Sequence, residues 1–170
     1  MHARHNGTAQ LDDNPVAERM AIGEATREIE INVAQNLFSS SLLPMTERHL
    51  QGAPHSGYVG KATAPMMTLD HYWATAMPDE KGPVGLKIDA QGYEGFILDG
   101  LIKHLPRVDL IFAEMSLVPL YTGAPSFIEL YTRICRAGFR CASIRDAFTD
   151  PRTAEMLAVD GLFVRDTVNK

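Results

Sequence analysis

The most regular pattern of apolar and polar positions lies in the second half of the chain. Residues 84–89 predict a short strand that ends on Asp89. Residues 108–115 form a nearly continuous apolar run with Glu114 near its end, which is typical of a buried parallel strand. Between them, apolar positions at helical spacing predict a helix that begins near Tyr93.

A second helix is predicted where Ser126 and Glu129 form a capping-box pattern, and Gly138 is a suitable stop for it. Two strands and a short helix are expected after that, at 139–144, at 161–164 and from Asp150. Because strands and helices alternate along this half, the sequence indicates an α/β fold with a mainly parallel sheet.

The first half is less regular. Residues 16–22 and 28–33 predict two strands joined by a tight turn. Residues 44–65 are rich in Gly, Pro and His without a period, and we expect either a mobile substrate-side lid or a plain connector. Thr68 or Asp70 caps a short helix. Residues 1–15 are expected to be a disordered tail before a domain at 16–170.

Composition narrows the class of protein. The 170 residues carry 16 basic and 21 acidic side chains, a net charge of -5, which argues against a nucleic-acid binder. No apolar run approaches the roughly 18 residues of a membrane span, and the N-terminus has no signal-peptide pattern. The two cysteines, Cys135 and Cys141, lack metal-site spacing and are expected to be core thiols of a cytoplasmic protein.

Three acids are candidates for chemistry, because ligands bind at the carboxyl ends of parallel strands. Asp89 and Glu114 end two such strands, and Glu94 follows in the first turn of the next helix. Together they could bind a hard cation, act as a general base or hold a cationic ligand. Structural alternatives remain: Glu94 could stabilise the helix N-terminus, and Glu114 could pair with a base. Lys87 is either a partner of these acids or an edge residue.

Residues 86–94, L-K-I-D-A-Q-G-Y-E, resemble the K-I-D-x-x-G-x-E signature of FkbM-type methyltransferases. Further segments similar to that family follow its order along residues 16–166, namely A-I-G-E at 21–24, S-S-S-L at 39–42, T-L-D at 68–70, F-A-E at 112–114, L-Y at 120–121, A-G-F at 137–139 and D-G-L-F-V at 160–164.

The resemblance implies a class I, Rossmann-like fold and transfer of a methyl group from S-adenosylmethionine to an oxygen of a sugar or secondary metabolite. It implies that Asp89, Glu114 and Glu94 lie at the catalytic, acceptor side of the site. It also implies that Ala21, Ile22 and Asp89 contact the cofactor. The expected partner is a small-molecule acceptor.

One departure from the family pattern is the absence of a glycine-rich turn of the type V-x-D-x-G-A-N-x-G. We therefore expect a partial class I domain that lacks the first two βα units, an open edge on the 86–89 strand, self-association, and weak cofactor binding. The alternatives are a catalytically inactive remnant or binding module, and a metal-dependent α/β hydrolase that uses Asp89 and Glu114.

Overall fold

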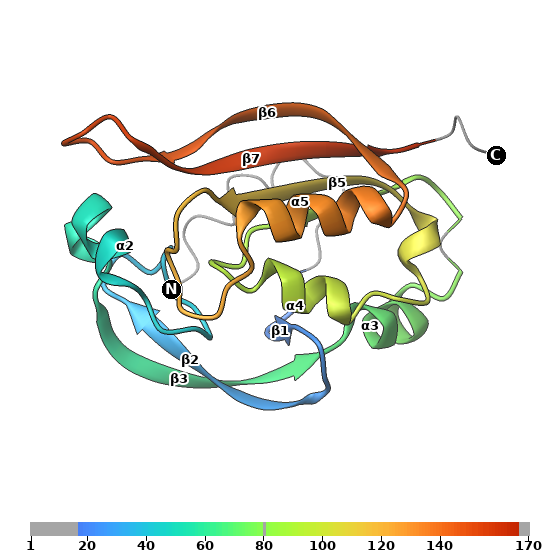
Figure 1. The fold of residues 1–170 in the computed structure, drawn as a ribbon. Coiled ribbons are helices and arrows are strands. Elements are labelled where there is room, and N and C mark those ends of the chain that lie inside the picture. Colours follow the sequence, from blue (N-terminus) through green and yellow to red (C-terminus); the bar gives the residue numbers. More distant parts are fainter. Residues whose placement is uncertain (1–16, 80, 167–170) are drawn as a thin grey trace.

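A computed structural model describes residues 17–79 and 81–166 and contains two β-sheets (Figure 1). The three-stranded sheet has the order β1-β3-β2 and the four-stranded sheet the order β4-β5-β7-β6. The strands are β1 (Ala21–Ile22), β2 (Arg27–Ala34), β3 (Tyr58–Met67), β4 (Val84–Ile88), β5 (Val108–Ser116), β6 (Phe139–Thr149) and β7 (Met156–Arg165). The helices are α2 (Glu47–Gly52), η1 (Pro54–Ser56), α3 (Leu69–Ala76), α4 (Glu94–Asp99), η2 (Leu105–Arg107) and α5 (Phe127–Arg136).

The four-stranded sheet is mixed, so the expectation of a mainly parallel sheet is wrong. Strands β4 and β5 are parallel, but β7 runs antiparallel to both β5 and β6 and lies between them. Residues 150–155, where a helix was expected, instead form the turn that folds β7 back along β6. Buried Asp150 holds this turn together, because its carboxylate binds Arg48 and Arg152.

The three-stranded sheet differs most from the prediction. The two predicted strands do not pair with each other; β1 and β2 both pair with β3, one parallel and one antiparallel. The expected irregular loop at 44–65 is wrong, since it contains α2, η1 and most of β3. Strand β3 is solvent-exposed along most of its length, so its sequence lacks the alternation that marks a half-buried strand.

Several local predictions are confirmed. The β4 and β5 strands and the start of α4 lie where the pattern places them, although α4 ends earlier, at Asp99. The Thr68 side chain caps α3. Ser126 and Glu129 make both hydrogen bonds of a capping box at α5, and Gly138 follows the helix with a φ of +90°.

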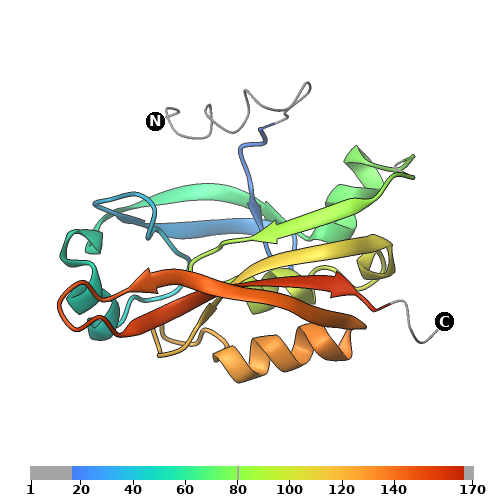
Figure 2. The same cartoon turned by 90° about the horizontal axis from the view of Figure 1, so that it is seen from above.

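The main core lies between the four-stranded sheet and the helices α4 and α5, with fully buried residues such as Ile111, Ile134 and Phe163. The hairpin of β2 and β3 lies on the side of the molecule opposite β6 (Figures 1 and 2). Cys135 and Cys141 are free thiols packed against this core. Within the described residues, none of the helices has the length and apolar character needed to cross a membrane.

Candidate active site

The site is built around the turn from β4 to α4, which contains the signature residues. Glu94 is only 5% exposed, and its Oε1 accepts the backbone N–H groups of Ala90 (3.0 Å) and Gly92 (3.2 Å). A Cβ on Gly92 would lie 2.9 Å from the Cβ of Tyr121, and the φ of Gly92 is +93°. The turn therefore requires both the glycine and the glutamate for its shape. The pKa of Glu94 is raised, foremost by burial.

Asp89 follows β4. Its side chain is 42% exposed at the end of the strand. One oxygen binds Lys87 Nζ at 2.9 Å and the other accepts the Gln91 side-chain amide at 2.9 Å. Lys87 is thus an exposed edge residue that pairs with Asp89. The exposed carboxylate keeps access to a ligand at the end of the strand.

Glu114 lies on β5 opposite Asp160 of β7 in the strand register. No hydrogen bond to its carboxyl group is found among the described residues. Burial, followed by the negative charges of Asp89, Glu94 and Asp160, raises the pKa of Glu114 to about 8, against a smaller opposing effect of Lys87. Four acids, Asp89, Glu94, Glu114 and Asp160, thus lie near one end of the sheet, and the pKa is raised for two of them, Glu94 and Glu114.

A hydrogen-bonded network joins this turn to the loop after β2. Tyr121, which is buried, donates its hydroxyl to the Gln91 side-chain oxygen at 2.9 Å, and Ser41 Oγ donates to the Gln91 carbonyl at 2.7 Å. The sequence analysis did not single out Gln91 or Asp160. Both lie inside segments that resemble the family, and this resemblance was the one signal that could have identified them. Their contacts depend on the strand register, which the sequence does not give.

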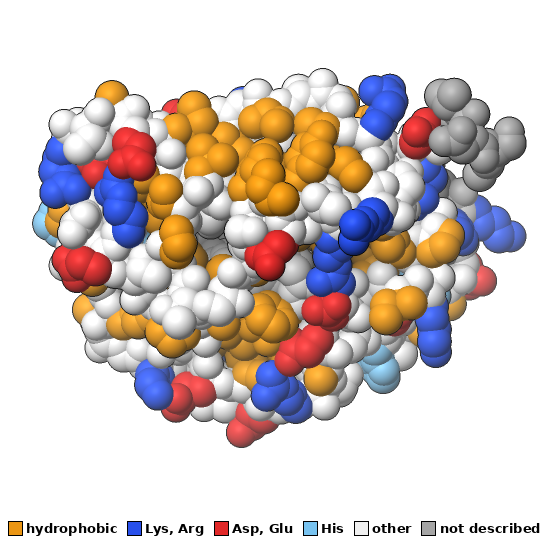
Figure 3. Space-filling view, in the orientation of Figure 1, with side chains coloured by type: hydrophobic (Ala, Val, Ile, Leu, Met, Phe, Trp, Pro, Cys, Tyr) orange, Lys and Arg blue, Asp and Glu red, His pale blue; other side chains and the backbone are white. Residues whose placement is uncertain are grey.

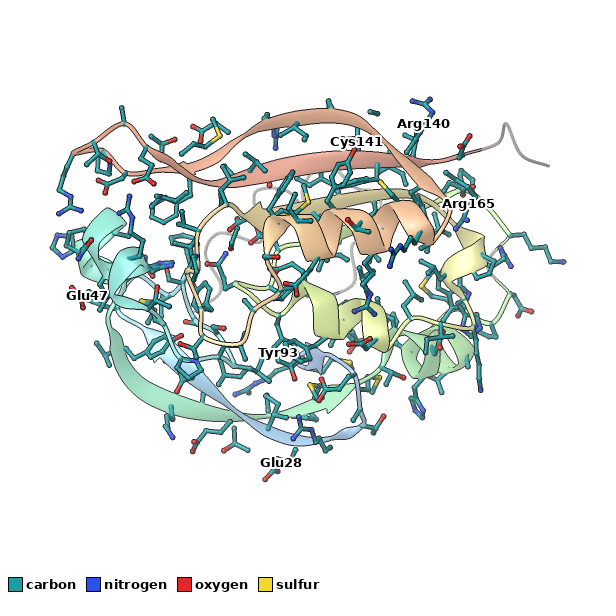
Figure 4. The ribbon with its side chains drawn as sticks, viewed as in Figure 1. Glu28, Glu47, Tyr93, Arg140, Cys141 and Arg165 are labelled. Carbon is teal, nitrogen blue, oxygen red and sulfur yellow. The ribbon has the colours of Figure 1, made fainter. Side chains whose placement is uncertain are left out.

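The residues expected to bind the cofactor lie in β1. Ala21 and Ile22 pair with β3 on one side, and β1 is at the edge of its sheet. The adjoining Glu24 accepts the Tyr93 hydroxyl at 2.6 Å, and Tyr93 extends from the start of α4 toward this region (Figure 4). The two segments that resemble the family therefore meet, although no hydrogen bond or ion pair between described residues joins Asp89 to Ala21 or Ile22.

A cavity lies away from these acids. A groove of about 310 Å³ separates α4 from the loop before α5, and the Arg133–Asp99 ion pair (2.5 Å) lies in it. Figure 3 shows this face, with apolar side chains gathered over α5 and charged ones beside them. The three charged side chains that line the groove already have partners. Arg133 and Asp99 pair with each other, and Glu129 forms the capping box of α5. The acids near the end of β4 are therefore the candidate site. No group of three or more metal-ligating side chains occurs within the residues that the structure describes.

Comparison with known proteins supports the signature. The family model of the methyltransferase FkbM domain matches residues 4–141. This range includes β1 to β5, the β4–α4 turn and Glu114; the similar segment at 160–164 lies outside it. No curated protein and no solved structure matches the chain. Because the family model covers most of the sequence, the chain belongs to the FkbM methyltransferase domain family.

Proposed function

We propose that this chain forms the acceptor side of an S-adenosylmethionine-dependent O-methyltransferase site. The observation that carries the proposal is Glu114, a largely buried carboxyl group without a hydrogen-bond donor, beside the exposed carboxylate of Asp89. A base whose pKa lies near the working pH is well suited to take a proton from a hydroxyl group. An amine acceptor that is neutral would not require such a base.

The residues present fit the cofactor in part. S-adenosylmethionine supplies a methyl group bound to a positively charged sulfur. The carboxylates of Asp89, Glu94 and Asp160 create a negative potential that favours a cation at this end of the sheet. Strand β1 pairs with β3 on one side only. The backbone N–H and C=O groups of Ala21 and Ile22 that point away from β3 are oriented to contact a flat heterocycle. The described residues thus offer charge and backbone contacts, and we expect weak binding by this chain alone.

In this proposal the acids have separate tasks. Glu114, in its ionised form, takes the proton of the acceptor hydroxyl. The oxygen would then accept the methyl group that S-adenosylmethionine supplies, as the methyl–sulfur bond breaks and the neutral thioether S-adenosylhomocysteine leaves. Asp89 orients the acceptor through its exposed carboxylate, and Glu94 maintains the turn. Because Glu114 has a pKa of about 8 and must be ionised to act, kcat/KM is expected to rise as the pH increases from 6 to about 8.

Two isosteric variants test the assignment. Glu114→Gln and Asp89→Asn each keep shape but remove a negative charge, and we expect methyl transfer to fall on the order of a hundredfold or more. Glu114→Gln should also abolish the rise of kcat/KM toward pH 8. Glu129→Gln is the control, because this acid only caps α5. Near-wild-type turnover by Glu114→Gln would exclude it as the base.

We further propose a small-molecule acceptor, a cytoplasmic location and self-association. The two free thiols at the core support a reducing compartment. Self-association is supported by β4, which among the described strands has a neighbour on one side only. Light scattering over a range of protein concentrations is expected to show a mass that increases with concentration. A stable monomer that binds S-adenosylmethionine with micromolar affinity in calorimetry would contradict both the association and the weak binding.

A further inference from the structure

Gln91 has a strained backbone conformation and makes three hydrogen bonds in the β4–α4 turn. Its φ is +53°, in the left-handed region that few residues other than glycine adopt. Its carbonyl accepts Ser41 Oγ at 2.7 Å, its Oε1 accepts the Tyr121 hydroxyl at 2.9 Å, and its Nε2 donates to Asp89 Oδ1 at 2.9 Å. Backbone strain that is held by several interactions is often found at functional sites.

The direction of the Gln91 amide is set by its two side-chain partners. An ionised Asp89 can only accept hydrogen bonds, so the amide nitrogen must face it and Oε1 must face the Tyr121 hydroxyl. Tyr121 is 3% exposed, packs against Gly92 and shares its hydroxyl with the carbonyl of Ser39 at 3.2 Å. The side chain of Gln91 is therefore anchored at its far end by a residue that cannot easily move.

Without Gln91, little would fix the carboxylate of Asp89. Its other partner is Lys87, whose side chain is 63% exposed. Exposed ion pairs are weak, because water competes for both charges and the long lysine side chain keeps many rotamers. The Gln91 amide, whose oxygen is held by the Tyr121 hydroxyl, is therefore the contact that fixes the orientation of the Asp89 carboxylate.

We propose that Gln91, braced by Tyr121, is a positioning residue that holds the carboxylate of Asp89 beside Glu114 at the carboxyl end of β4. This role rests on the proposed function, in which these two acids meet the acceptor. It predicts that the charge of Asp89 reaches Glu114 only while the Gln91 contact exists. A group that merely stabilised the turn would not change the charge that Glu114 experiences.

Titration of Glu114 in the free chain tests this role without requiring catalysis. Carboxyl ¹³C NMR on protein labelled at glutamate follows the resonance that disappears in Glu114→Gln. Gln91→Gly suits the positive φ and removes the amide, so the pKa of Glu114 is expected to fall by about half a pH unit as Asp89 turns toward solvent. Gln91→Glu places a second carboxylate beside Asp89 and is expected to shift the pKa upward. Tyr121→Phe, which keeps the buried ring, should shift it downward by less than Gln91→Gly does.

The control is Gln51→Ala, which removes an exposed glutamine side chain from α2 and should leave the titration unchanged. In the reaction, Gln91→Gly is expected to lower kcat about tenfold with a smaller change in KM, as for a misplaced catalytic group. Identical titration of Glu114 in wild type, Gln91→Gly and Gln91→Glu would overturn the positioning role. If these pKa shifts occur but the protein transfers no methyl group, only the proposed function would be overturned. If Gln91→Gly does not fold, Tyr121→Phe and Gln91→Glu decide the question.

Discussion

Two partly buried acids, Asp70 of α3 and Glu114 of β5, show how the same chemical group serves opposite purposes in this molecule. The carboxylate of Asp70 accepts the backbone N–H groups of Ile102, Lys103 and His104 within 3.0 Å, and the His104 ring as well. Burial alone would raise its pKa, but these donors outweigh burial and lower the pKa to about 2. Glu114 has no such donors among residues 17–79 and 81–166, and its pKa rises to about 8.

The difference teaches how to separate structural acids from reactive ones. Donors of hydrogen bonds stabilise the ionised form, so a carboxylate that has them is committed to holding the fold. Asp70 joins α3 to the chain after α4 in this way, which explains the last residue of the T-L-D segment. A more deeply buried carboxyl group without donors, such as Glu114, has a raised pKa and is suited to proton transfer near neutral pH. Asp150, with its donors, belongs with Asp70, whereas burial outweighs the two backbone donors of Glu94 and raises its pKa.

The largest effect that would test this comparison is expected at Asp70. Asp70→Asn keeps the size of the side chain but places an amide N–H₂ where donors converge, so the free energy of unfolding at pH 7 should fall by about 2–3 kcal/mol. Urea denaturation followed by circular dichroism measures it. Asp79→Asn, at an exposed position, is the control and should change the stability by less than about 0.5 kcal/mol. An unchanged stability in Asp70→Asn would remove the structural half of the comparison.

Acid titration of stability should show the same contact in the wild-type chain. The folded pKa of Asp70, about 2, lies below its ordinary value of 3.8. The stabilisation is therefore present above pH 4 and is lost as the pH falls toward 2, by about 2 kcal/mol. Asp70→Asn should lack this portion of the acid-dependent loss. Parallel stability curves for the two proteins between pH 4 and 2 would contradict the low pKa.

Glu114 should show the opposite sign. Its folded pKa of about 8 lies above the ordinary 4.5, so its contribution is complete below pH 4.5 and is lost as the pH rises through 8. Glu114→Gln cannot ionise, and its free energy of unfolding should exceed that of the wild type by about 1–2 kcal/mol at pH 9. At pH 5 the two should be nearly equal. A variant that is less stable than the wild type at pH 9 would show that Glu114 has donors after all.

The smallest effect extends the comparison to Glu24, an acid that accepts the Tyr93 hydroxyl. Tyr93→Phe removes the hydroxyl that Glu24 accepts and keeps the buried ring, so stability should fall by about 0.5–1.5 kcal/mol. The pKa of Glu24, lowered by this hydroxyl and by Arg27 against the effect of burial, should rise in the variant. Thermal unfolding and NMR titration measure the two changes. If neither quantity changes, the hydrogen bond between Tyr93 and Glu24 does not stabilise the fold.

The sequence by itself determined several local elements of the second half. Residues 84–94 predict a strand, a turn and a helix, and they carry the family signature that the family model supports. Ser126, Glu129 and Gly138 mark the ends of α5, because caps act through neighbours a few residues away. Such signals can be identified from the sequence alone, because the interacting residues are close together along the chain. Asp89 and Glu114 could be named as candidates for the same reason, since both end predicted strands.

The tertiary structure alone decided the strand order, the environment of each acid and the brace at Gln91. Insertion of β7 between β5 and β6 places Asp160 opposite Glu114, and no pattern within 10 residues of either acid contains that pairing. Strand β3 was missed because its exposed positions gave no alternation. Burial and hydrogen-bond donors come from segments distant in sequence, as with Ile102 at Asp70. Since the pKa of a carboxyl group depends on those distant groups, its role follows from the folded chain and not from its position in the sequence.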